Sequence, residues 1–325
     1  MDIELLTVLC GKKRHSWEHL LQKAGLVPEE QPEQTALLWD GETLIAAGSR
    51  QGNILKYLVV DSEHQGEGLL ATLLTALRQE AFRQGHSHLF LYTKPQNEHL
   101  FLPLLFYPVA RTSQVLLMED KKDGIRTFLD ALPVDTPAEK AGAVVMNCDP
   151  FTLGHRYLIE TAAGECDRLY VFVLSEDKGH FSATDRLNTV KAGTADLPNV
   201  TVLPTGPYLI SSATFPTYFL KNRDEAEKIQ CQLDVAIFTQ YFAPKFHIAC
   251  RYVGTEPLSA LTARYNQALE ETLPSHGIQL KQLRRLEADG RPISASAVRA
   301  ALIAGDWNTV QTLVPKTTFD YLRSI

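Results

Sequence analysis

The segment Asn147-Cys-Asp-Pro-Phe-Thr-Leu-Gly-His155 lies between two stretches with different hydrophobic patterns. The apolar run 143–146 (AVVM) before it is typical of a buried strand, and residues 155–165 (HRYLIETAAGE) after it have the pattern of a helix. Ligands of open parallel sheets bind at the carboxyl ends of strands, where helix N-termini present free N–H groups. We therefore expect His155 to donate a hydrogen bond to a phosphate from the first turn of this helix, and Thr152 either to cap the helix or to make a second contact of that kind.

A second segment, Arg291-Pro-Ile-Ser-Ala-Ser-Ala-Val-Arg299, places two hydroxyls and a guanidinium at the start of another helix. Ser294 or Ser296 is suited to the N-cap, and Arg299 follows Ser296 by about one helical turn. Hydroxyls, free N–H groups and a cationic fork together suit the β- and γ-phosphates of a nucleotide. Each segment also has a purely structural interpretation, as a common β–loop–α junction or as a capped helix with a solvated arginine.

Strand-like and helix-like patterns alternate around these two segments. This alternation indicates a Rossmann-like, doubly wound parallel sheet of the α/β class. Beyond 143–165 the pattern predicts strands at 168–174 and 200–204, two strands within 234–254, and helices at 184–193, 295–304, 306–313 and 318–324.

The N-terminal half has a different pattern, typical of an α+β domain. Apolar runs on either side of Asp40-Gly41, within 35–47, predict a hairpin. The polar, proline-containing stretch 131–142 separates the two halves, so we expect domains at 1–135 and 136–325. After the hairpin we expect a strand at 54–60, a Gly-rich turn at 61–68, a helix at 69–85 and a strand at 88–93.

Composition excludes several classes of protein. A net charge of −6 gives no global basic surface for nucleic acid or anionic lipid. The five cysteines are scattered and form no CxxC pair, which argues against a disulfide framework or a metal site and favours a reducing compartment. The most apolar stretch, 100–110, is short and contains two prolines, so it does not predict a membrane span. With no basic leader at the N-terminus, we expect a cytoplasmic protein.

The two segments together resemble the signatures of the nucleotidylyltransferase superfamily, (H/T)xGH near the first strand and ISxSxxR near the end. Thr152-Leu-Gly-His155 and Ile293-Ser-Ala-Ser-Ala-Val-Arg299 match these patterns, with Thr152 as the variant first residue. The resemblance implies that the motifs hold ATP with Mg²⁺ on its phosphates, and that catalysis comes from positioning and charge stabilisation. It implies contacts to the α-phosphate region from His155 and Thr152, and to the β/γ-phosphates from Ser294, Ser296 and Arg299.

Further residues around these motifs are candidate ligands of the nucleotide. Lys178, just after the strand expected at 168–174, is placed to shield the repulsion between a carboxylate substrate and the phosphates, although it also suits a solvated surface position. Arg186 on the next helix has the same two interpretations. The remaining candidates are Asn147, Pro150, Phe151 and Gly154 of the first motif, and Gly254 and Glu256 after a later strand, which could line an adenine pocket.

In the N-terminal half, the turn at 61–68 resembles the pyrophosphate loop of acetyl-CoA-dependent N-acetyltransferases, (Q/R)xxGx(G/A). Gln65 and Gly68 match this pattern, with Gly66 between them, whereas Leu70 stands where a glycine or alanine is usual. The resemblance implies a loop that binds the CoA pyrophosphate at a helix N-terminus. The alternative is a fold retained for docking without acetyl-CoA turnover.

The combination of these two halves resembles the citrate lyase ligase family over nearly the whole chain. The stretches VVMNCDPFTLGHRYLIE, VFVLSEDK and YVGTEP are similar to that family. The resemblance implies an acid–thiol ligase that converts acetate and ATP to acetyl-adenylate and pyrophosphate. The acetyl group then passes to the thiol of a phosphoribosyl-dephospho-CoA arm on the acyl carrier subunit of citrate lyase, with release of AMP. Two other activities stay open: an adenylyltransferase that makes a dinucleotide, and an N-acetyltransferase that uses acetyl-CoA.

Overall fold

The structure is a computed structural model that describes residues 1–29, 31–134, 139–176, 179–209, 215, 218–220, 223–255, 260–288 and 290–325. These residues form two compact units. The first comprises 1–124 and 216–229, and the second comprises 125–215 and 230–325. The domain boundary expected between 135 and 136 falls in a stretch that the structure does not describe, so it stays a prediction.

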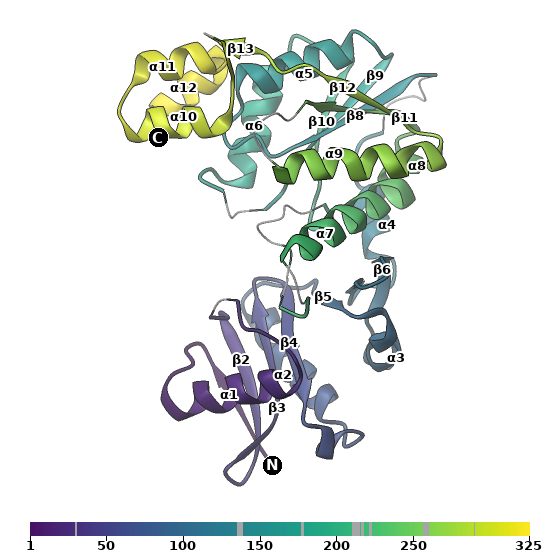
Figure 1. The fold of residues 1–325 in the computed structure, drawn as a ribbon, viewed down its shortest axis with the longest axis vertical. Helices are drawn as coiled ribbons and strands as arrows, with labels where there is room; N and C mark the ends of the chain where they lie inside the picture. The colour runs from purple at the N-terminus through teal and green to yellow at the C-terminus, as the bar shows by residue number, and fades with distance from the viewer. Residues whose placement is uncertain are drawn as a thin grey trace. The chain divides into compact units, whose positions relative to one another are not determined.

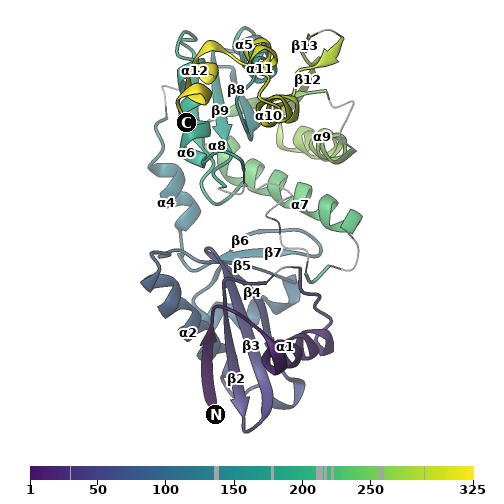
Figure 2. The same ribbon diagram turned by 90° about the vertical axis from the view of Figure 1, so that its left-hand side faces the viewer.

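The first unit is built on a seven-stranded sheet in the order β1-β2-β3-β4-β5-β7-β6. Neighbouring strands are antiparallel except for β4 and β5, which are parallel. Helices α1 (Gly11–Lys23) and α2 (Leu69–Arg83) cover opposite faces of the sheet (Figure 2). The other elements are β1 (Asp2–Leu6), β2 (Gln34–Asp40), β3 (Thr43–Gln51), β4 (Ile54–Val60), β5 (Phe90–Thr93), α3 (Glu98–Phe101), β6 (Tyr107–Arg111) and β7 (Leu116–Glu119).

Helix α2 buries the apolar face that its sequence predicts. Leu73, Leu74, Leu77 and Ala81 are at most 1% exposed and pack against β2, β3 and β4. Burying side chains of this size contributes about 1.5–3 kcal/mol each, so this contact fixes the helix on the sheet. The hairpin, strand, turn, helix and strand expected from 35 to 93 are all confirmed.

Strands β4 and β5 are paired over only a short stretch. Their register joins Ile54 to Phe90 and Leu55 to Leu91, and the pairing does not continue past these residues. The chain after Leu55 therefore diverges from β5. This divergence opens a cavity that is described below with the candidate site.

The second unit contains a five-stranded, fully parallel sheet in the order β10-β9-β8-β11-β12, which confirms the α/β prediction (Figure 1). On one face, Ile159 of α5 and Val190 of α6 pack against Val144 and Val171. On the other face, the ring of Phe172 lies 5.3 Å from that of Phe242, between ring centres. The elements are α4 (Gly124–Asp130), β8 (Ala141–Met146), α5 (Leu153–Ala163), β9 (Arg168–Val173), α6 (Ala183–Gly193), β10 (Val200–Pro204), β11 (Ile248–Gly254), α9 (Ala260–Thr272) and β12 (Gln279–Leu283).

The prediction of two strands within 234–254 is wrong for the first of them. Residues 234–245 belong to helix α7 (Arg223–Ile237), a π-helical turn at Phe238–Phe242 and α8 (Ala243–Lys245), and only β11 is a strand. Most side chains of this helical stretch are buried, and its exposed stripe is short, with Gln240 and Pro244 on it. An apolar run without periodicity does not distinguish a buried helix from a buried strand.

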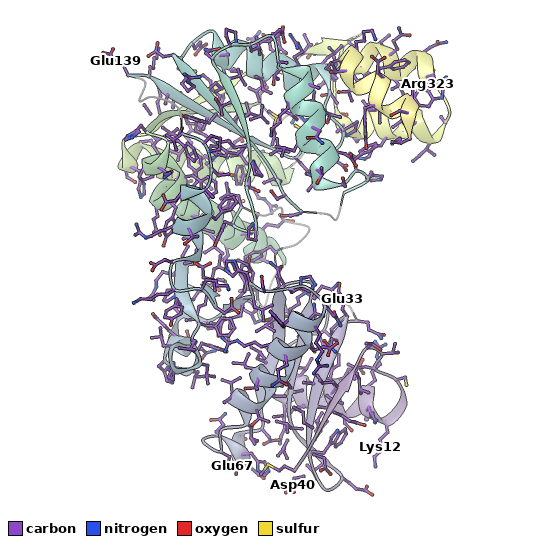
Figure 3. All side chains as sticks on the ribbon, turned by 180° about the vertical axis from the view of Figure 1, so that it is seen from behind. Lys12, Glu33, Asp40, Glu67, Glu139 and Arg323 are labelled. Carbon is purple, nitrogen blue, oxygen red and sulfur yellow. The ribbon has the colours of Figure 1, made fainter. Side chains whose placement is uncertain are left out.

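The chain ends in three short helices that were expected from the sequence. Helices α10 (Ala295–Ile303), α11 (Trp307–Leu313) and α12 (Lys316–Ser324) follow a small hairpin of β13 (Glu287–Ala288) and β14 (Arg291–Pro292). They bury a cluster of their own, and Arg323 lies on the last of them (Figure 3). The Arg323 guanidinium lies 4.6 Å from the ring centre of Trp307. Within the described residues, no helix is long and apolar enough to cross a membrane. The five cysteines are free thiols.

Candidate nucleotide site

The first motif caps helix α5 with two reciprocal hydrogen bonds. The Thr152 hydroxyl accepts from the backbone N–H of His155 over 3.3 Å, and His155 Nδ1 accepts from the backbone N–H of Thr152 over 3.1 Å. An N-cap of this kind contributes about 1 kcal/mol to helix stability. The cap thus confirms the expected role of Thr152 and fixes the orientation of the imidazole ring.

His155 is a neutral hydrogen-bond donor in this arrangement. Because Nδ1 accepts a hydrogen bond, the ring proton is on Nε2, which leaves one N–H free to donate. Burial, together with the positive charge of Arg285, lowers the pKa of His155 to about 4. The ring lies parallel to that of Phe151, with 6.1 Å between centres. At neutral pH the side chain therefore donates a proton in a hydrogen bond without carrying a charge.

The second motif begins helix α10 in the expected way. Ser294 is the N-cap, and its hydroxyl accepts from the backbone N–H of Ala297 over 3.2 Å. The hydroxyls of Ser294 and Ser296 lie 2.9 Å apart. Arg299 is partly buried and donates to the backbone carbonyl of Asp149 in the first motif. Two hydroxyls and a guanidinium are thus grouped at a helix N-terminus.

The two motifs meet in space, although more than a hundred residues separate them in the sequence. Gly154 packs so closely against the second motif that a Cβ there would lie 3.0 Å from the carbonyl oxygen of Ile293. Arg299 contacts Asp149 at both its carbonyl and, over 3.6 Å, its carboxylate. Both motifs follow or adjoin the carboxyl end of β8, which is where ligands of doubly wound sheets bind.

Asp149 connects the first motif to a third loop. Its carboxylate, 6% exposed, accepts hydrogen bonds from the backbone N–H groups of His180 and Phe181, each over 3.0 Å. A Cβ on Gly179 would lie 2.9 Å from the same carboxylate, so this loop also approaches closely. Asp149 therefore holds the loop before α6 against the strand end, a role that its position before a proline does not reveal.

Arg186 supports the site from inside the protein. The side chain is 1% exposed and donates to the backbone carbonyls of Asn147, Phe181 and Glu176, and to the side-chain oxygen of Asn147. A guanidinium with this many protein acceptors positions the loops around the nucleotide site. The expectation of a solvated surface charge is wrong, because the side chain is fully enclosed.

The remaining predicted residues differ in their surroundings. Asn147 is exposed, whereas Pro150 and Phe151 are buried, and Phe151 belongs to the core below His155. Gly254 lies at the carboxyl end of β11, where its carbonyl accepts from Asn266 over 3.0 Å. Lys178 and Glu256 lie outside the described residues, and their roles stay predictions.

Arg285 is a cation near the site that the sequence did not indicate. It follows β12 and donates from Nε to the carbonyl of Thr255 over 2.7 Å, and its charge reaches His155. Strand β12 was not expected from the sequence pattern, so nothing placed Arg285 at the carboxyl edge of the sheet. A lone arginine in an unassigned stretch carries no signal by itself.

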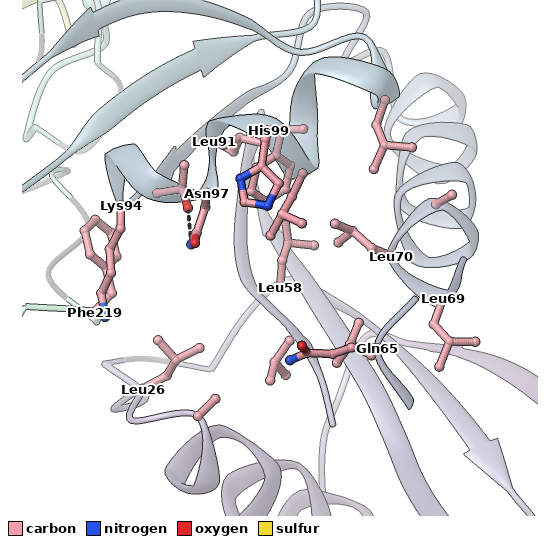
Figure 4. Close-up of a pocket in the computed structure, with 18 of the residues that line it drawn as sticks. Leu26, Leu58, Gln65, Leu69, Leu70, Leu91, Lys94, Asn97, His99 and Phe219 are labelled. Atoms are coloured by element: carbon pink, nitrogen blue, oxygen red, sulfur yellow. Dashed lines mark hydrogen bonds between the residues drawn. The ribbon is translucent and has the colours of Figure 1, made fainter. Parts of the chain in front are cut away.

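The first unit holds a separate cavity of about 750 Å³ where β4 and β5 diverge (Figure 4). Leucines form much of its wall, among them Leu58, Leu70 and Leu91, with Lys94 and Asn97 on one side. The predicted residues Gln65, Gly66 and Gly68 also line it. Gly68 is the N-cap of α2 with φ of 77°, a left-handed conformation that favours glycine.

The fold and the paired motifs define a nucleotidylyltransferase-like unit joined to an N-acetyltransferase-like unit. Residues 141–322 match the family described as "Citrate lyase ligase C-terminal domain", and residues 12–101 match the "Acetyltransferase (GNAT) family". The citrate (pro-3S)-lyase ligase of Klebsiella pneumoniae is 39% identical over 319 residues, which cover 96% of this chain and 93% of that protein. The same-named protein of Escherichia coli K12 is 40% identical over 291 residues, covering 87% and 83%. The chain therefore belongs to the citrate lyase ligase family.

Solved structures resemble the two units separately. Thermotoga maritima TmcAL bound with alpha-thio ATP is similar with a TM-score of 0.37 and 14% identity, covering 57% of this chain and 55% of that chain. Escherichia coli ElaA is similar with a TM-score of 0.33 and 12% identity, covering 37% of this chain and 99% of that chain.

Proposed function

We propose that this protein activates citrate lyase by ATP-dependent acetylation of its acyl carrier subunit. Membership of the citrate lyase ligase family supports the overall reaction. The observation that carries the chemistry is the meeting of Thr152, His155, Ser294 and Arg299 at the carboxyl edge of the parallel sheet. The donor set fits a nucleoside triphosphate, because it combines neutral N–H and O–H donors with a guanidinium.

The first step joins acetate to AMP. An acetate oxygen bonds to the α-phosphorus of ATP, and the bond from that phosphorus to the oxygen bridging the β-phosphate breaks, so that pyrophosphate leaves. The Nε2–H of His155 donates to the α-phosphate oxygens, on which negative charge develops. Ser294, Ser296 and Arg299 hold the β/γ-phosphates, and Lys178 shields the approaching carboxylate. Mg²⁺ held by the phosphates would neutralise part of their charge.

The second step transfers the acetyl group to sulfur. The thiolate of the phosphoribosyl-dephospho-CoA arm bonds to the acetyl carbon, and the bond from that carbon to the phosphate oxygen breaks to release AMP. The thiol proton goes to solvent or to the departing phosphate. This assignment makes the protein an AMP-forming acid–thiol ligase.

We also propose that the cavity in the first unit binds the CoA-like arm. Such an arm is long and narrow, with phosphates at one end and an apolar, amide-containing chain leading to the thiol. The cavity offers both environments, with the Gln65–Gly68 turn and the N-terminus of α2 at one part and leucine side chains at another. Leu70, where the related loop has a small residue, also lines this cavity.

Exchange of labelled pyrophosphate into ATP tests the first step without the carrier subunit. With Mg²⁺ and a panel of small carboxylates, we expect exchange that requires acetate. His155→Ala and Arg299→Ala should reduce it by at least a hundredfold, because each removes a donor to the phosphates. His276→Ala and Arg323→Ala remove the same residue types away from the motifs and should leave the rate unchanged. If neither carboxylates nor added carrier subunit support exchange, the proposed function is wrong.

A further inference from the structure

A buried series of polar side chains crosses the second unit beneath its sheet. Arg251 of β11 donates from Nη2 to the hydroxyl of Tyr265 on α9 over 3.1 Å, and Tyr265 donates to the carboxylate of Asp234 on α7. Arg251 is 1% exposed and Asp234 is 6% exposed. The guanidinium also lies 4.2 Å from the ring centre of Phe238. A cation and a carboxyl group are therefore both held away from bulk water.

Two nitrogens of Arg251 are buried without a hydrogen-bond acceptor. No residue in the described part of the chain accepts a hydrogen bond from Nε or Nη1. Buried polar groups are nearly always partnered, because an unmet donor costs about 1–3 kcal/mol and more when it is charged. The guanidinium does not escape this cost by losing its proton. Its free donors indicate an acceptor that the described residues do not supply.

Arg251 lies on the face of the sheet opposite α5, in the middle of β11, where it is paired with Ala143 of β8 and Leu280 of β12. Cys250 and Tyr252 point into the core below α5, so the alternation of side chains along β11 directs Arg251 to the other face. Gly254, three residues further on, ends the strand. The charge of Glu176, just after β9, reaches Asp234, and the Glu176 carbonyl is bonded to Arg186. The Asp234 end of the buried group therefore lies within electrostatic range of the loop that Arg186 holds beside the nucleotide motifs.

We propose that Arg251, with Tyr265 and Asp234 beside it, forms the binding site for the small carboxylate substrate. A free N–H of Arg251 would donate to one carboxylate oxygen, and the other oxygen would be left to react. The apolar ring of Phe238 offers a wall for the methyl group. This proposal rests on the proposed function for the identity of the carboxylate as acetate, but the anion site itself is inferred from the unmet donors.

The charges around Arg251 disfavour a doubly charged ligand. Asp234 already offsets the charge of the guanidinium, and Glu176 adds negative potential nearby. Tyr265 stays neutral, because burial raises its pKa well above the ordinary value, and the other titratable neighbour is the buried thiol of Cys231. A dianionic phosphate would meet more repulsion than a carboxylate in these surroundings. The negative charge of Asp234 also weakens binding of the carboxylate. Removing this charge should therefore strengthen binding, whereas removing Arg251 should weaken it.

Opposite shifts in two variants test the site. In the exchange reaction, Arg251→Gln should raise the acetate concentration for half-maximal rate at least tenfold, because the cation is lost. Asp234→Asn should lower that concentration, because the repelling charge is lost. The dissociation constant for a non-hydrolysable ATP analogue should stay within twofold in both. A structural role for the buried group predicts the same direction of change in both variants, and that result would overturn the proposal.

Binding measured without catalysis separates this proposal from the proposed function. We expect sodium acetate to raise the melting temperature of the wild-type protein relative to sodium chloride at equal ionic strength. The shift in melting temperature should be larger in Asp234→Asn and absent in the double variant Arg251→Gln/Asp234→Asn. The double variant leaves no unpaired buried charge, so it serves as the test if Arg251→Gln alone fails to fold. Arg50→Gln, which removes an equally buried arginine from the first unit, should keep the wild-type shift. Equal shifts in all variants would show that acetate does not bind at Arg251.

Discussion

His155 shows how one side chain acquires its chemistry from three neighbours. The backbone N–H of Thr152 fixes the proton on Nε2, Phe151 supports the ring, and burial together with Arg285 keeps the imidazole neutral. A charged donor would form an ion pair with the phosphate of bound ATP and stabilise the ground state as well as the transition state. An uncharged donor avoids this ion pair and still stabilises the charge that develops on the phosphate in the transition state. The proton position thus follows from the helix cap.

The pKa of His155 makes a prediction about stability. The unfolded chain binds a proton at this residue near pH 6.5, whereas the folded chain binds it only near pH 4. Stability is therefore fully present above pH 6.5 and falls as the pH drops towards 4, by up to about 3 kcal/mol at about 1.4 kcal/mol per pKa unit. NMR titration of the imidazole and urea unfolding at several pH values should show both effects. His155→Gln should flatten this part of the pH dependence, and an imidazole that titrates near 6.5 would contradict the assignment.

At the residue scale, the sequence revealed the side chains that belong to short local patterns. Thr152, His155 and Ser294 form caps whose hydrogen bonds span three residues, so their spacing carries the information. Arg186 and Arg251 are different, because their environments are assembled from several elements far apart in the chain. Nothing in the neighbouring residues distinguishes a buried arginine from a solvated one.

At the scale of elements, helix α5 is held at its N-terminus by contact with the second motif. Gly154→Ala places a Cβ about 3.0 Å from a backbone carbonyl of Ile293, so the two motifs must separate by a few tenths of an ångström. We expect at least a tenfold higher KM for ATP in the exchange reaction, despite the better helix propensity of alanine.

A second glycine at the other end of the same helix provides the control. At Gly164 a Cβ would meet its nearest atoms at an ordinary 3.6 Å, and the backbone is right-handed helical. Gly164→Ala should therefore raise stability by less than about 1 kcal/mol and leave the exchange kinetics unchanged. Equal effects of the two substitutions would show that close approach of the motifs is unimportant.

Elements with a clear period were predictable, and a largely buried segment was not. Helix α2 has one apolar face and the hairpin of β2 and β3 has Asp40-Gly41 at its turn, so both were found. The segment 234–245 exposes only a short stripe with Ala236, Gln240 and Pro244 on it, and two of these three residues are not polar, which weakened the signal for a helix. Strand β12 lies at the edge of the sheet and none of its side chains is fully buried, so it has no apolar run that would indicate a strand.

At the scale of the whole molecule, the two units are proposed to serve two steps of one reaction, and matched glycines test this division. Gly68 and Gly85 flank helix α2, both with positive φ and no atom within 4 Å of an added Cβ, but only Gly68 lines the cavity. Gly68→Val should reduce acetyl transfer to the carrier subunit at least tenfold while acetate-dependent exchange persists. Gly85→Val carries similar backbone strain and should spare both steps. Loss of acetyl transfer in both variants would show that backbone strain causes the defect. If neither variant loses acetyl transfer, the cavity has no role in that step.

The pairing of two domain types was readable from the sequence, but the path of the chain between them was not. Residues 216–229 return to the first unit after the chain has built β8, β9 and β10 of the second. No local pattern marks this return, because its contacts are to residues more than a hundred positions earlier. Tyr218, for example, donates to the carbonyl of Tyr92 over 3.3 Å and lies 4.5 Å from Tyr57 between ring centres.

This return of the chain limits how the gene can be cut and recombined. A fragment ending near residue 130 contains every strand of the first sheet but lacks Tyr218, so Tyr57 keeps its contact with Trp17 and loses the one with Tyr218. A graft of the same fragment onto a foreign partner would carry that defect with it. The first unit therefore cannot be exchanged as one continuous segment of the chain. A functional chimera has to carry residues 216–229 along with residues 1–124.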